Sequence, residues 1–311
     1  KPDYQAACYD LPEPTFRHIA YQQYKGKRPK MDEGLAIQIN RSRDILKVFG
    51  IPVYDAPGFE ADDVLGTIAE QVGNFKSKTL KPKIIIASGD LDTLQLVRNQ
   101  DVVVYTLKKG IQDAVIYDEK GVKERFGFLP KFLPDFKGLK GDPSDNILGV
   151  PGIGDKGATE LIQKFGGLEE IYRLLEKNEK KFLAAGFKQR TVDLLKKHKE
   201  EAFFSKELAV IRRDAPIKFK RQDSAWEEKY SFFGAEKLFQ ELGFKSLRAR
   251  LPRPKYPTAV VAGGPVPFGQ KSVVQDNFSF LPKADPPFAE KEIPSKQLKK
   301  LQVAAWLLDS R

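Results

Sequence analysis

Apolar and polar positions alternate along the first 136 residues with two periods, one typical of buried strands and one typical of helices. Four short apolar runs predict strands, at Tyr4–Tyr9, Ile51–Tyr54, Lys83–Ala87 and Asp101–Tyr105. Between them, apolar residues recur at helical spacing over residues 35–49, 61–72 and 91–97. This alternation predicts an α/β fold with a central parallel sheet flanked by helices.

The pattern changes further along the chain. Residues 137–250 lose the strand pattern and predict helices joined by Gly-rich turns, including one Lys-rich helix at Gln189–Ala202. Residues 251–294 are rich in Pro and Gly, which predicts a linker. The apolar segment Lys296–Leu308 predicts a helix that opens a further domain. We therefore expect four parts, at 1–136, 137–250, 251–294 and 295–311.

Composition narrows the class of protein. Hydrophobic residues make up 41% of the 311 positions, which supports a folded core, and no apolar run is long enough to span a membrane. Cys8 is the single cysteine, so disulfides and structural zinc are excluded and we expect a cytoplasmic setting. The net charge of +11 raises the expectation of a polyanionic partner, because neutralised phosphates release counterions.

Acidic residues gather in four clusters despite this basic background, each after a predicted strand or at the start of a helix. They are Asp10; Glu60, Asp62 and Asp63; Asp90 and Asp92; and Asp142 and Asp145. The carboxyl ends of the strands in an open α/β sheet line a ligand-binding crevice, so we expect these side chains to converge there. Each cluster alone could merely cap a helix, but four at equivalent positions favour a shared metal site.

Such a site would repel itself without divalent cations, and oxygen ligands favour Mg²⁺ or Mn²⁺ over zinc. Two ions about 4 Å apart can bind the attacking water and the leaving oxygen of a phosphodiester. The sequence therefore predicts hydrolysis that uses two metal ions and no nucleophilic side chain.

A Gly-rich turn begins at Gly149 and predicts a contact with nucleic acid. Gly152, Ile153 and Gly154 lie in it, and Lys156 follows at the opening of the next helix. Backbone N–H groups at a helix start can hold a phosphate, as in a helix-hairpin-helix, which grips backbone without reading bases. The alternative is a turn that only packs two helices.

A second basic segment mixes cations with aromatic residues between Phe16 and Lys30. Arg17, Tyr24, Lys25 and Arg28 belong to it. This mixture suits single-stranded nucleic acid, through phosphate pairing and base stacking, although a solvated loop is the simpler interpretation. Its position just after Asp10 favours a functional role.

Taken in order, these motifs resemble the 5′-to-3′ exonuclease domain of bacterial DNA polymerase I and the wider PIN-like, flap-endonuclease family. The resemblance covers roughly residues 3–250. The matching pieces are Cys8-Tyr9-Asp10, Phe16-Arg17-His18, Tyr24-Lys25 with Arg28-Pro29, Pro57-Gly58-Phe59-Glu60-Ala61-Asp62-Asp63-Val64-Leu65, Gly89-Asp90-Leu91-Asp92, Gly141-Asp142-Pro143-Ser144-Asp145-Asn146 and the Gly-rich turn.

The resemblance assigns roles to these residues. It implies that seven carboxylates form the metal site, and that Asp63 lies close to them. The seven are Asp10, Glu60, Asp62, Asp90, Asp92, Asp142 and Asp145. It also implies that Arg17, Lys25 and Arg28 steer the scissile phosphate and the 5′ strand, with Arg17 and Lys25 neutralising phosphate charge during catalysis. A K⁺ ion is implied at the helix-hairpin-helix.

The resemblance also bears on both ends of the sequence. Members of the family have an earlier strand that ends in an Asp-Gly pair and supplies another metal ligand, whereas this sequence opens after that point, so we expect a sheet without one central strand. The segment Gln297–Asp309 resembles the beginning of a 3′-to-5′ exonuclease-like domain.

Three functions remain to be compared. The first is a monomeric nuclease that cuts branched, nicked or 5′-flap double-stranded DNA in replication and repair, with no membrane partner. The second is a DNA-binding module without catalysis. The third is a ribonuclease on a related acidic α/β fold, which explains the carboxylates but not the helix-hairpin-helix.

Overall fold

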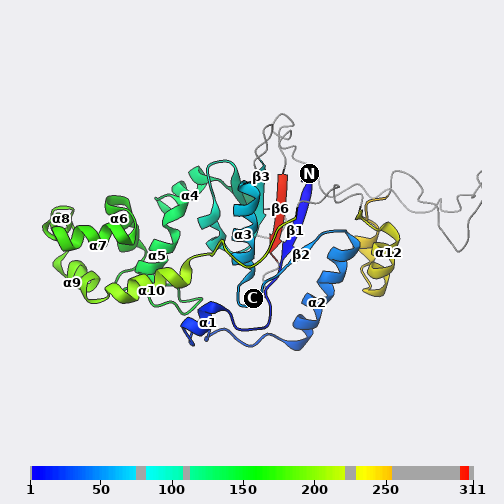
Figure 1. The fold of residues 1–311 in the computed structure, drawn as a ribbon, viewed down its shortest axis with the longest axis horizontal. Coiled ribbons are helices and arrows are strands. Elements are labelled where there is room, and N and C mark those ends of the chain that lie inside the picture. Colours follow the sequence, from blue (N-terminus) through cyan, green and yellow to red (C-terminus); the bar gives the residue numbers. More distant parts are fainter. Residues whose placement is uncertain (1, 75–81, 108–112, 221–228, 254–301, 308–311) are drawn as a thin grey trace, which may run out of the picture.

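The computed structural model describes residues 2–74, 82–107, 113–220, 229–253 and 302–307. Its strands form one six-stranded sheet in the order β2-β1-β6-β3-β4-β5 (Figure 1). The strands are β1 (Tyr4–Cys8), β2 (Val53–Tyr54), β3 (Lys83–Ala87), β4 (Val102–Leu107), β5 (Ala114–Tyr117) and β6 (Gln302–Leu307). Every neighbouring pair is parallel except β4 and β5, so the predicted α/β fold is confirmed and carries one antiparallel edge strand.

The segment Gln302–Leu307 corrects two expectations. It was predicted to be helical, but it forms β6, which pairs in parallel with β1 on one side and β3 on the other. A short apolar run does not distinguish a strand from a helix, and here two flanking strands offer backbone N–H and C=O groups that a helix would leave unpaired. The central position that was expected to be empty is therefore held by β6.

Helices flank the sheet and form most of the second half of the chain (Figure 1). Around the sheet lie α1 (Phe16–Ala20), α2 (Glu33–Val48), α3 (Ala61–Gly73), the 3₁₀ helix η1 (Leu91–Leu96), α4 (Glu119–Phe126) and the 3₁₀ helix η2 (Pro130–Phe132). The later helices are α5 (Leu133–Lys140), α6 (Asp155–Phe165), α7 (Leu168–Lys177), α8 (Lys180–Ala184), α9 (Gln189–Lys197), α10 (Lys199–Ala209), α12 (Phe232–Glu241) and α13 (Lys245–Arg248). Within the described ranges, no helix is both long and apolar enough to cross a membrane.

Two boundaries differ from the predicted ones. The single helix expected at Gln189–Ala202 is two helices, α9 and α10, which meet at His198. The boundary expected at residue 136 lies inside α5. The predicted linker at 251–294 falls outside the described residues after Arg253.

One hydrophobic core joins the sheet to the helical region. α3 packs Val64, Leu65 and Ile68 into this core, and each is at most 1% exposed. The same cluster continues into the helices, where it includes Leu161 and Leu195. Because buried contacts run without interruption between the two regions, the position of α6 is fixed relative to the strands.

Candidate active site

The predicted acidic clusters meet at one edge of the sheet. Asp10 follows β1, and its Oδ1 accepts a hydrogen bond from the N–H of Ala61 at the start of α3 (2.7 Å). Asp90 follows β3 and caps η1 by accepting from the N–H of Asp92 (2.8 Å). The structure thus brings the ends of two strands and the start of α3 together, as the strand order of an open α/β sheet requires.

Asp62 lies at the centre of this acidic group. Burial raises the pKa of Asp62 well above its ordinary value, and four neighbouring carboxylates raise it further. In order of effect these are Asp90, Asp92, Glu60 and Asp10. The Oδ1 atom of Asp62 is buried and has no hydrogen-bond partner among the described residues. A buried carboxylate oxygen without a donor is costly, so this position fits a bound cation.

A lysine that sequence reasoning missed lies between two other carboxylates. Lys137, on α5, donates hydrogen bonds from Nζ to both Asp92 and Asp142. Burial raises the pKa of Asp92 to about 6 despite this lysine. Burial also raises the pKa of Asp142, but Lys137 and Ser144 outweigh it and leave that pKa at about 2. One oxygen each of Asp92, Asp142 and Asp145 lie within 4.8 Å of one another, which is metal-ligand spacing.

Glu60 and Asp145 are joined by the basic segment after α1. Lys25 Nζ lies 2.7 Å from Glu60 Oε1, and Arg28 Nη2 lies 2.6 Å from Asp145 Oδ1. The side chains of Lys25 and Arg28 are 22% and 33% exposed, so both reach the surface beside the carboxylates. Burial opposes the charge on Lys25, but Glu60 and Asp145 still raise its pKa above the ordinary value.

The backbone of Lys25 has a φ of 52°, in the left-handed region that a residue with a Cβ rarely adopts. Its N–H donates to the carbonyl of Asp145 at 2.9 Å, which holds this conformation. A strained residue tied to an acidic loop is typical of functional sites.

Tyr24 does not take its predicted place. The residue is 4% exposed, and its ring packs with Ile147 and Leu208 in a small buried cluster. Its hydroxyl donates to Glu60 (3.2 Å) and Asp145 (3.1 Å). The structure therefore contradicts direct stacking of Tyr24 on DNA and shows it linking two carboxylates.

Arg17 and Asp63 are also corrected. Arg17 is 2% exposed and Asp63 is 0% exposed, and the two form a bidentate pair at 2.7 and 2.8 Å. The remaining N–H groups of Arg17 donate to the carbonyls of Leu208 and Val210 and to Glu60. Because all of its donors are used inside the protein, Arg17 is not placed to contact a phosphate, and Asp63 is not placed to bind a metal.

The Gly-rich turn leads directly into α6, as predicted. Gly154 caps the helix, and Gly152 has a φ of 90°, which only glycine adopts readily. Gly152, Gly154 and Lys156 are exposed, whereas Ile153 is buried and offers only its backbone. A Cβ at Gly154 would meet no atom within 4 Å, so a phosphate has room to approach the helix start.

The helix before this turn does not extend as far as the turn. α5 ends at Lys140, and the loop that carries Asp142 and Asp145 lies between it and the turn. Acidic loop and Gly-rich turn are therefore consecutive, which places the carboxylates next to the predicted DNA contact.

A groove of about 1030 Å³ connects the carboxylates to α6. Asp90, Asp92 and Asp142 line one part of it, and Lys156 lines another. Three further cations line the groove and were not singled out from the sequence, namely Arg125, Lys137 and Lys140. Their spacing along α4 and α5 carries no motif, so only the fold brings them together.

Family models match nearly three quarters of the chain. The N-terminal resolvase-like domain of the 5′-3′ exonucleases matches residues 1–127, and the C-terminal SAM fold of the 5′-3′ exonucleases matches residues 128–231. The chain belongs to the 5′-3′ exonuclease family.

Two curated relatives specify the setting of these domains. The chain is 37% identical over 257 residues to DNA polymerase I of Bacillus caldotenax, which covers 82% of this chain and 27% of that protein. It is 36% identical over 256 residues to DNA polymerase I of Bacillus subtilis, with 81% and 27% covered. The chain thus spans about a quarter of the length of these relatives, and it aligns with their 5′-nuclease part.

Solved structures show the same fold. A T5 5′-exonuclease with bound divalent zinc ions superposes with a TM-score of 0.54 at 20% identity, covering 77% of this chain and 83% of that one. A T5 D15 flap endonuclease in a pseudo-enzyme-product complex with DNA and metal ions gives a TM-score of 0.51 at 21% identity, covering 66% and 72%. At this level of identity the likeness extends to the fold alone.

Proposed function

We propose that the chain hydrolyses phosphodiesters in nicked or 5′-flap double-stranded DNA and uses two Mg²⁺ or Mn²⁺ ions. The observation that carries this proposal is the buried, unpartnered Oδ1 of Asp62 among four other carboxylates, two of which, Asp90 and Asp92, line a groove that reaches α6. Oxygen-only donors suit these hard cations. The ions would be held by the carboxylates around Asp62 and by the loop carrying Asp142 and Asp145.

The chemistry that such ions supply is a more acidic water and charge stabilisation at the leaving 3′-oxygen. The protein's own residues do the rest. Lys25 and Arg28 would place positive charge beside the scissile phosphate, since both are partly exposed next to Glu60 and Asp145. Lys137 would neutralise Asp92 and Asp142 until ions bind in its place.

The N–H groups at the start of α6, with Lys156, would hold the DNA backbone in the same groove that the carboxylates line. Because this contact uses phosphates, we expect binding to weaken steeply with salt. A K⁺ ion at the Gly-rich turn, a monomeric state and roles in replication and repair remain predictions from the family resemblance.

Cleavage of an end-labelled 5′-flap DNA by the chain with Mg²⁺ or Mn²⁺ tests the proposal, with binding measured separately on the same DNA. The Asp90→Ala, Asp142→Ala double variant is expected to bind the DNA but not to cut it. Asp193→Ala, at an exposed position of α9, serves as the control and is expected to cut normally. Undiminished cleavage by the double variant would contradict the proposal, and so would binding without cleavage by the unaltered chain. A matching RNA substrate tests the ribonuclease alternative, and preferred cleavage of RNA would support that alternative.

A further inference from the structure

The chain that leaves α10 crosses α3 (Figure 1), and three of its backbone N–H groups bind α3 side chains. We call residues 208–219 the strap. Three α3 side chains four residues apart lie on one face of the helix and bind strap backbone. Asp63 accepts from the N–H of Arg212 (2.8 Å), Thr67 accepts from that of Ala215 (3.0 Å), and Gln71 accepts from that of Phe219 (2.8 Å).

Two side chains from other elements hold the beginning of the strap. Arg17, from α1, donates to the carbonyls of Leu208 (2.8 Å) and Val210 (2.7 Å). Gln95, from η1, donates to the carbonyl of Ala209 (3.1 Å) and accepts from the N–H of Ile211 (2.8 Å). The bonds at Leu208, Ala209 and Ile211 are buried, so each satisfies a backbone group that would otherwise lack a partner.

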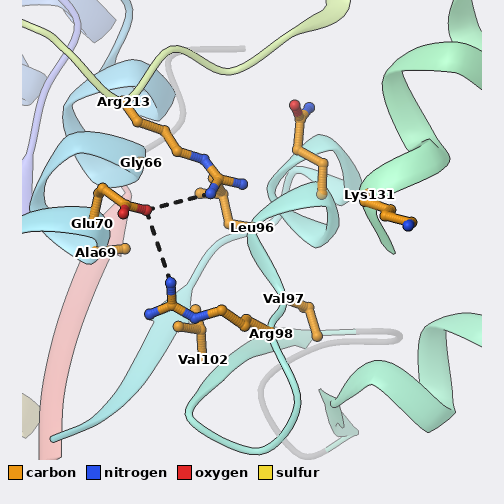
Figure 2. Close-up of a pocket in the computed structure, with 10 residues that line it drawn as sticks. Gly66, Ala69, Glu70, Leu96, Val97, Arg98, Val102, Lys131 and Arg213 are labelled. Carbon is orange, nitrogen blue, oxygen red and sulfur yellow. Dashed lines mark hydrogen bonds and ion pairs between the residues drawn. The ribbon is translucent and has the colours of Figure 1, made fainter. Parts of the chain in front are cut away.

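The strap also approaches α3 closely. A Cβ on Gly66 would lie 2.7 Å from the carbonyl oxygen of Arg212. Figure 2 shows the solvent side of this contact, where Glu70 pairs with Arg213 at 3.4 Å and with Arg98 at 3.9 Å. Arg213 is 46% exposed, which separates this surface pair from the buried pair of Arg17 and Asp63.

The strap links the first turn of α3 to the helical region that carries α6. Its buried anchor Asp63 is adjacent to Asp62 on the first turn of α3. Its other end is α10, which packs along α5 so closely that a Cβ on Gly138 would lie 2.8 Å from the carbonyl oxygen of Ala202. α5 in turn leads through the acidic loop to the Gly-rich turn and α6.

We propose that the strap, locked by Arg17 and Asp63, sets the distance between the phosphate contact at α6 and the carboxylates, and so determines which phosphodiester is cut. Arg17 is a positioning residue in this proposal and does not touch DNA. The proposal rests on the proposed nuclease function, because it concerns the register of the same cleavage.

The test is the length of the products from an end-labelled 5′-flap DNA, resolved to one nucleotide. Arg17→Met is expected to spread cleavage from the wild-type position to neighbouring positions and to lower kcat more than it raises KM. Arg17→Lys, which keeps the charge but not the forked geometry, is expected to restore part of the wild-type distribution. Arg213→Met removes an arginine from the exposed pair on the same strap and is expected to cut as the wild type does.

Two further variants separate positioning from stability. Val104→Ala leaves a cavity in β4, outside the strap contacts, and is expected to lower the melting temperature without moving the cut. Gly66→Ala displaces the strap without removing a charge and is expected to spread the product lengths. It therefore tests the proposal even if Arg17→Met does not fold. Unchanged product lengths in folded Arg17→Met or Gly66→Ala, with only a lower rate, would overturn the proposal. Absence of cleavage by the wild-type chain would instead overturn the nuclease function itself.

Discussion

Asp62 and Asp63 are neighbours on the first turn of α3, yet their surroundings differ: the negative charge of Asp63 is paired within the residues that the structure describes, whereas that of Asp62 is not. On the Asp63 side, the cation is built in, because Arg17 forms a bidentate pair with the carboxylate and the N–H groups of Glu60 and Arg212 complete its hydrogen bonds. On the Asp62 side, further carboxylates crowd around an oxygen that has no partner in the described part of the chain.

The difference separates structure from function within one motif. A buried charge that is fully paired stabilises a particular arrangement of the chain, whereas a buried charge left without a partner destabilises it unless something else binds. The contacts of Asp63 therefore stabilise the fold, whereas the carboxylates around Asp62 repel one another until a cation binds. The following predictions test this division, in order of decreasing effect.

The largest effect is expected from Asp63→Asn. The change leaves the buried guanidinium of Arg17 without its carboxylate, so the free energy of unfolding should fall by about 3–5 kcal/mol. Chemical denaturation measures it. Asp214→Asn, which removes the carboxylate of an exposed pair with Arg212, is the control and should leave stability unchanged. A small loss of unfolding free energy for Asp63→Asn would mean that the pair of Arg17 and Asp63 does not stabilise the fold.

The pH dependence of stability should change sign near pH 4, because the pKa values of Asp92 and Asp142 are shifted in opposite directions. The folded-state pKa of Asp92 is raised to about 6, so in metal-free protein its contribution is lost as pH rises from about 4 to 6, by up to about 3 kcal/mol. The folded-state pKa of Asp142 is lowered to about 2, so its contribution is lost as pH falls from about 4 to 2. Unfolding in EDTA across pH measures both, and Asp92→Asn should remove the loss above pH 4. A metal-free protein that gains stability between pH 4 and 6 would contradict this.

Lys137→Met tests a lysine that pairs with two carboxylates of the proposed metal site. Lys137 competes with divalent ions for Asp92 and Asp142, so its removal should tighten Mn²⁺ binding by about tenfold, or ~1.4 kcal/mol. Calorimetric titration measures the change. Lys140→Met, whose lysine pairs with exposed Asp155, is the matched control and should bind Mn²⁺ as the wild type does. Weaker binding by Lys137→Met would show that the lysine supports the ion instead of competing with it.

Tyr24→Phe should have the smallest effect. It removes one neutral donor that Glu60 and Asp145 share, while Lys25 and Arg28 remain paired with them, so we expect a loss of about 1 kcal/mol in stability. Thermal unfolding measures it. A loss as large as that of Asp63→Asn would place Tyr24 among the principal supports of the fold.

The sequence predicted the strands and the acidic clusters because their signals are local. Lys83–Ala87 is a β-branched run at the position of β3, and Asp90 and Asp92 follow it directly. The parallel sheet then brings such strand ends together without further information.

The errors concern residues whose partners are far away in the sequence. Arg17 was expected to contact a phosphate, but it binds the carbonyl of Leu208, 191 positions later. No local pattern reports that burial, and an arginine beside aromatic residues has the same appearance in a DNA-binding loop. Lys137 was missed for the same reason, because its role depends on Asp92, 45 positions earlier.

The most direct measurement compares thermal unfolding of the wild type and Asp62→Asn, each in EDTA and with saturating Mn²⁺. We predict that Asp62→Asn raises the melting temperature in EDTA, because it removes a crowded carboxylate, and abolishes most of the stabilisation that Mn²⁺ gives the wild type. A variant that is less stable than the wild type in EDTA, or equally stabilised by Mn²⁺, would contradict the claim that Asp62 is held ready for a cation.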